Sequence, residues 1–62
     1  MVYLCKWDKA LRTLIFFKQG GRNVITWTVH RSDAVIFVDA QHALDAALIN
    51  DIHDFMLLVQ EC

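Results

Sequence analysis

Proline is absent from the 62-residue sequence, and glycine occurs only twice, as the adjacent pair Gly20-Gly21. The chain therefore has no proline-rich linker, and it contains no low-complexity tract or internal repeat that would divide it. A chain of this length forms one domain, which we place at residues 1–62. Such a short domain buries only about 60% of the surface that its unfolded chain exposes, so its stability margin is small.

Cysteine is also scarce, because Cys5 and Cys62 are the only two in the sequence. Two cysteines do not make the disulfide framework of a small secreted domain, so we expect reduced thiols in a cytoplasmic protein. A disulfide that ties the two ends together is the alternative. The sequence lacks the features of a signal peptide and any uncharged apolar run long enough to span a bilayer, so we expect no membrane partner.

Apolar side chains are in excess, since they make up 56% of the residues. Soluble domains usually contain about 45–50%. Small domains often compensate for a limited core by forming oligomers. We therefore expect a homodimer or a higher homo-oligomer.

Charge is divided unevenly between the two halves of the chain. The first 31 residues hold six basic residues and one acid, Asp8, whereas the last 31 hold six acids and no basic residue. Either the two halves form one neutral surface through intrachain ion pairs, or the basic half is an interaction face.

Three apolar runs between Thr13 and Val38 are separated by two short polar breaks, which is the pattern of an antiparallel meander. The first break contains Gly20-Gly21, because glycine readily adopts the positive φ that a two-residue hairpin turn needs. The second is Arg31-Ser32-Asp33, since serine and aspartate can bond to the local backbone. We expect three strands with turns at these two places.

The apolar pattern differs among these strands. In the middle run, Ile25, Trp27 and Val29 alternate with polar residues, which indicates one apolar face. The runs Leu14–Phe17 and Val35–Val38 are apolar at every position, which is typical of strands covered on both faces. One helix covers only one face of a sheet, so we expect an uncovered apolar surface.

A further strand is expected at Met1–Trp7, with Tyr3, Cys5 and Trp7 on one face. A turn at residues 8–10 would follow it. Near the other end, Asp39 is placed to cap the amino end of a helix that starts at Ala40, and His42 occupies its third position. Alanine and leucine at helical spacing continue this helix.

Beyond Asn50 two interpretations are open. The apolar stripe can continue as one long helix to about Gln60, or the helix can end at Asn50-Asp51 with a last strand over Phe55–Val59. The leucine, methionine, glutamine and glutamate residues favour the helix. We therefore predict an α+β fold: an antiparallel meander of three to four strands with a C-terminal helix packed on one face.

No residue pattern indicates catalysis, a metal or another cofactor. The histidines His30, His42 and His53 lack the close spacing that metal ligands need. The only serine, Ser32, lies in an expected turn and has no evident base. We expect no enzyme.

The sequence instead favours a small non-enzymatic protein–protein interaction module, which self-associates and inhibits or regulates another protein of unknown identity. The alternative is a regulator that binds nucleic acid through a basic sheet face. For the protein interface we choose apolar residues from the strand runs and the carboxyl-terminal segment: Ile15, Phe17, Val35, Phe37, Phe55 and Val59. For the nucleic-acid alternative we choose the basic residues near the strand ends: Lys18, Arg22 and Arg31.

Overall fold

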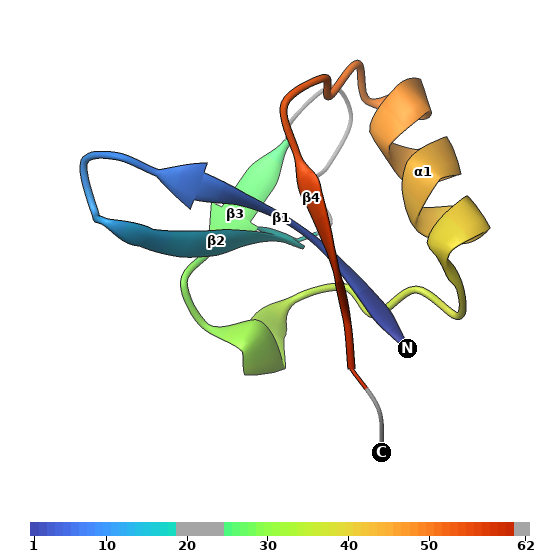
Figure 1. Cartoon of the computed structure of the whole chain (residues 1–62), viewed down its shortest axis with the longest axis horizontal. Coiled ribbons are helices and arrows are strands. Elements are labelled where there is room, and N and C mark those ends of the chain that lie inside the picture. Colours follow the sequence, from blue (N-terminus) through green and yellow to red (C-terminus); the bar gives the residue numbers. More distant parts are fainter. Residues whose placement is uncertain (19–24, 61–62) are drawn as a thin grey trace.

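The computed structural model describes residues 1–18 and 25–60. In these residues the chain forms a four-stranded antiparallel sheet and one α-helix (Figure 1). The strand order is β3-β2-β1-β4, so β1 lies inside the sheet and β4 at an edge. The predicted α+β class is confirmed. The elements are β1 (Val2–Asp8), β2 (Thr13–Lys18), β3 (Thr26–Thr28), the 3₁₀ turn η1 (Arg31–Asp33), α1 (Ala40–Ile49) and β4 (Met56–Val59).

A tight turn joins β1 to β2 and confirms the prediction for residues 8–10. The carboxylate of Asp8 accepts hydrogen bonds from the backbone amides of Ala10 at 2.9 Å and Leu11 at 3.0 Å. Arg12 has a φ of 55° and completes the reversal. Aspartate favours such a turn because its side chain replaces a backbone acceptor.

The sheet has a separate core on each face. On one face Tyr3 and Cys5 pack with Phe16, and on the other Leu4 packs with Phe17 and Ala47. This division follows the alternation predicted for the first strand. Helix α1 covers the face of Leu4, and its alanines Ala43 and Ala47 are buried. Their small side chains allow α1 to approach the sheet closely.

The prediction of a meander strand at Val35–Val38 is wrong. The pairing of β1 with β2 stops at Cys5 and Phe16. Beyond that point Val35 donates a backbone hydrogen bond to Phe17, and Phe37 exchanges two with Val2, at 2.9 and 2.8 Å. The segment therefore occupies the place where β1 and β2 separate, and it forms one isolated bridge instead of a ladder.

Of the two interpretations beyond Asn50, one long helix to about Gln60 is wrong, and a helix that ends at Asn50-Asp51 followed by a last strand is confirmed. Helix α1 ends at Ile49, and the amide side chain of Asn50 donates to the backbone oxygen of Ala46 at 2.7 Å. Asp51 then reverses the chain with a φ of 57°. The following strand, β4, pairs with Val2–Cys5 of β1, so the helix lies between β3 and β4 and is not C-terminal. The β4 segment forms a strand because the free edge of β1 supplies it with hydrogen-bond partners. Its apolar periodicity alone was also compatible with a helix.

The remaining sequence predictions concern the middle of the chain. The expected strand around Trp27 is present but short, because β3 covers only Thr26–Thr28. The break at Arg31–Asp33 is a 3₁₀ turn. The expected Gly20-Gly21 hairpin lies outside the described residues. Within the described part of the chain, no helix has the length and apolar character needed to cross a bilayer.

Asp39 caps α1 as predicted. Its carboxylate accepts the backbone amide of His42 at 2.9 Å and contacts the His42 ring nitrogen Nδ1 at 2.7 Å. The side-chain hydrogen bond with His42 lowers the pKa of Asp39 and raises the pKa of His42. The cap therefore contains an exposed acid–imidazole pair.

This pair predicts a pH dependence of stability. A lowered Asp39 pKa adds stability above its ordinary value of 3.8, which is lost as the pH falls through the folded-state pKa. A raised His42 pKa adds stability that is complete below 6.5 and is lost as the pH rises through the folded-state pKa. Thermal melting should therefore show that His42→Gln lowers the midpoint at mildly acidic pH and has less effect at alkaline pH. His30→Gln is the control, because the exposed His30 ring has no acid contact among the described residues. An equal effect of His42→Gln at both pH values would contradict the assignment.

The core on the α1 face predicts that replacing two nearby leucines, Leu4 and Leu11, changes the free energy of unfolding by very different amounts. Leu4 is 0% exposed, whereas Leu11 in the β1–β2 turn is exposed. Leu4→Ala should lower the free energy of unfolding by about 2–5 kcal/mol, because it leaves a cavity between the sheet and α1. Leu11→Ala should change it by less than about 0.5 kcal/mol. Urea denaturation measures both, and similar values for the two variants would exclude this core.

Candidate interaction surface

The residues predicted for a protein interface lie mostly within the chain's own core. Ile15 and Phe17 are buried in β2, on the face that α1 covers. Val35, Phe37 and Phe55 are half-buried and pack against the core of Phe17. Only Val59, in the edge strand β4, is strongly exposed, with 64% of its surface accessible. Their apolar character therefore reflects mainly internal packing.

The sheet face opposite α1 is only partly covered. Tyr3 and Phe16 pack edge to face there, with ring centroids 5.8 Å apart, and Ala34 lies against them. Farther along the same face, Trp7 is 55% exposed and Met56 is 47% exposed. We call this surface the open face, and its exposed members come from β1 and β4. Sequence reasoning placed Trp7 on the face of Tyr3 but did not select it for an interface.

Apolar side chains are also exposed on the other side of β4, along α1. Leu44 and Leu48 are exposed and line a hollow of about 360 Å³. Ile52 and Phe55, from the segment between α1 and β4, form part of the same hollow. The helix thus presents apolar side chains toward the segment that joins it to β4, as well as toward the core. Apolar residues occur on both the buried and the exposed side of α1, so the sequence pattern did not show which of them would remain exposed.

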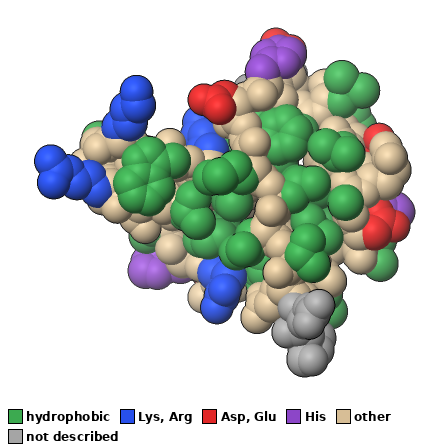
Figure 2. Space-filling model, viewed as in Figure 1, with side chains coloured by type: hydrophobic (Ala, Val, Ile, Leu, Met, Phe, Trp, Pro, Cys, Tyr) green, Lys and Arg blue, Asp and Glu red, His purple; other side chains and the backbone are tan. Residues whose placement is uncertain are grey.

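Figure 2 shows how these groups meet on the surface. Hydrophobic side chains form a band across the displayed face, from the β1–β2 hairpin, past β4, to α1. A strip of backbone crosses this band at the position of β4. We call this surface the apolar band, and its exposed members on the open face of the sheet are Trp7 and Met56.

The second tryptophan is less available for contacts. Trp27 is half-buried on the α1 side, where its ring packs edge to face on Phe17 with centroids 6.0 Å apart. The ammonium of Lys6 lies 4.5 Å from the Trp27 ring centroid, a cation–π arrangement. Trp27 and Lys6 also line a mostly polar hollow of about 510 Å³, together with Asp8 and His53. Among the described residues no three histidine, cysteine or acidic side chains are close enough to hold a metal ion.

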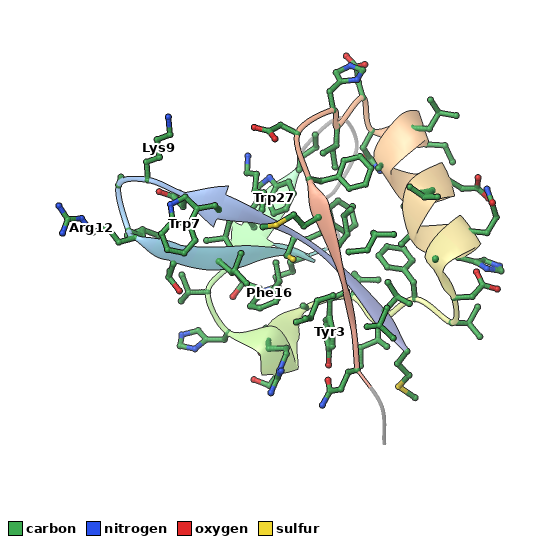
Figure 3. The ribbon with its side chains drawn as sticks, viewed as in Figure 1. Tyr3, Trp7, Lys9, Arg12, Phe16 and Trp27 are labelled. Carbon is green, nitrogen blue, oxygen red and sulfur yellow. The ribbon has the colours of Figure 1, made fainter. Side chains whose placement is uncertain are left out.

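Basic residues gather at a place that sequence reasoning did not select. Lys18 and Arg31 are exposed, whereas Arg22 lies outside the described residues. Figure 3 shows Lys9 and Arg12 extending from the β1–β2 loop, beside Trp7. No lysine or arginine in the described ranges lies within 4.0 Å of a carboxylate; the close acid contacts there are His42–Asp39 and His53–Asp51. The intrachain ion pairs expected as one alternative are thus absent from these residues.

Cys5 is a buried thiol in the core of the open face. Its Sγ donates to the backbone oxygen of Met56 at 3.6 Å, and burial raises the pKa of the thiol. A raised pKa leaves less of the reactive thiolate at neutral pH. Cys5 therefore has a packing role, and Cys62 lies outside the described residues.

No protein-family model matches the chain, and no significant match occurs among the curated proteins or the solved structures.

Proposed function

We propose that this chain is a small non-enzymatic interaction module that self-associates and inhibits or regulates another protein through its apolar band. The observation that supports this proposal most is the exposure of Trp7 and Met56 on the open face of the sheet. Contiguous apolar surface of this kind usually marks an interaction site in soluble proteins.

Sedimentation equilibrium tests the self-association directly. We expect a mass above that of one chain at micromolar concentration and only a weak change with salt, because apolar contacts are insensitive to ionic screening. A monomer from micromolar to millimolar concentration would contradict self-association. A dimer that dissociates as salt increases would show that charge, and not the apolar band, holds the copies together.

Nucleic-acid binding is a second candidate function, favoured by the exposed Trp7 ring beside Lys9 and Arg12 (Figure 3). An exposed aromatic ring can stack on a base while neighbouring cations contact phosphates. Fluorescence anisotropy should then show an affinity for single strands that falls linearly with salt on logarithmic axes. The double variant Lys9→Ala, Arg12→Ala should reduce this slope. The double variant Lys18→Ala, Arg31→Ala is the control with the same loss of charge, and an absence of binding at low salt would exclude this candidate.

A further inference from the structure

Strand β4 is an edge strand that lacks the usual protection against pairing. Its sequence, Met-Leu-Leu-Val, contains no charge and no proline. In the described part of the chain, no strand pairs with its outer side. Natural edge strands commonly carry lysine, proline or a bulge, because an open edge otherwise accepts another strand.

The hydrogen-bond phase shows which backbone groups of β4 point outward. Gln60 donates to the backbone oxygen of Met1 at 2.9 Å, so Gln60 faces β1. Hydrogen-bonded and non-hydrogen-bonded pairs alternate along an antiparallel ladder. Leu58 therefore bonds toward β1, whereas the amide and carbonyl groups of Leu57 and Val59 point to the open edge.

The sides of this edge are apolar on both faces of the sheet. On the open face lies Met56, and on the α1 face lies Val59, and both side chains are exposed. A strand added at this edge would therefore place its side chains against apolar neighbours above and below. A strand with apolar side chains would therefore fit this edge best.

We propose that the added strand is β4 of a second copy, in antiparallel orientation about a two-fold axis at Leu58. This inference rests on the proposed self-association and gives it a geometry. Two such copies would join their four-stranded sheets into one continuous sheet, with both helices on the same side.

The outward groups decide the register. When Leu57 of one copy faces Val59 of the other, all the outward amides and carbonyls of both strands are paired. A register in which Leu57 faces Leu57 places the Val59 groups opposite Phe55, which lies outside β4. The first register places Leu58 directly opposite Leu58 of the second copy, as a non-hydrogen-bonded pair with a Cα separation of about 4.5 Å.

A cysteine crosslink tests this geometry. In a chain carrying Cys62→Ser, the variant Leu58→Cys should form a disulfide-linked dimer rapidly under mild oxidation, because the Cα separation suits a disulfide. Met56→Cys is the matched control: it is more exposed, but it would lie about 13 Å along the strand from its copy, at about 3.4 Å per residue. Cys5 remains in all these chains because it is buried.

A pair of charge variants provides a second test that does not depend on the cysteine variant folding. Val59→Lys should raise the dimer dissociation constant about tenfold or more, because lysine on an edge strand opposes pairing. Val38→Lys is the control, since Val38 is 71% exposed and lies outside β4. Sedimentation equilibrium measures both, with circular dichroism to confirm that each variant is folded.

The outcomes separate this geometry from the proposed function. Crosslinking of Leu58→Cys but not Met56→Cys, with weakening by Val59→Lys alone, would support pairing through β4. A dimer of the unmodified chain without these effects would overturn the geometry and leave self-association in place. A monomer at every concentration would overturn both.

Discussion

The structure depends on the burial of one strand, β1, on both faces and its pairing on both edges. Its first four residues, Val2–Cys5, are all buried, and Leu4 and Cys5 are the largest side chains with almost no exposure. Strand β2 and the Phe37 bridge bond to one edge of β1, and β4 bonds to the other. Strands β2 and β4 and helix α1 thus contact β1 directly, whereas β3 pairs with β2.

The elements that pair with β1 and cover it leave one sheet face and one sheet edge exposed. The single helix covers the face of Leu4, while among residues 1–18 and 25–60 the opposite face is covered by the short segment that contains Ala34. Strand β4 completes one edge of β1 but becomes an open edge itself. The described part of this 62-residue chain contains no further helix or strand that could cover the open face or pair with β4. This constraint is the physical basis of the proposed self-association.

The sequence predicted correctly those elements that are formed by interactions between residues close together in the chain. The alternation in Met1–Trp7 predicted the two faces of β1, and Asp39 predicted the start of α1 through a side-chain bond to the nearby backbone. The segment 35–38 was assigned wrongly, and the choice between helix and strand for Phe55–Val59 stayed open, because the structure of both segments depends on distant partners. Phe37 bonds to Val2, and β4 pairs with β1, more than 50 positions away in sequence.

The candidate surface was less predictable than the fold. Residues such as Ile15 and Phe17 are apolar because both faces of β2 are buried, and the pattern alone does not say whether the same chain or a second copy covers them. Trp7 and Met56 carry the exposed apolar surface, and only the pairing of β1 with β2 and β4 brings them onto one face. The outward groups of Leu57 and Val59 are a property of the ladder, which no local pattern encodes.

Amide hydrogen exchange, measured residue by residue at low and high protein concentration, tests the central claim that a second copy completes the open edge of β4. At low concentration the amide of Leu58 should exchange slowly, because it bonds to β1, whereas the amides of Leu57 and Val59 should exchange rapidly. At high concentration all three amides should exchange slowly. Rapid exchange of Leu57 and Val59 at every concentration, in a sample that sedimentation shows to be dimeric, would contradict the account.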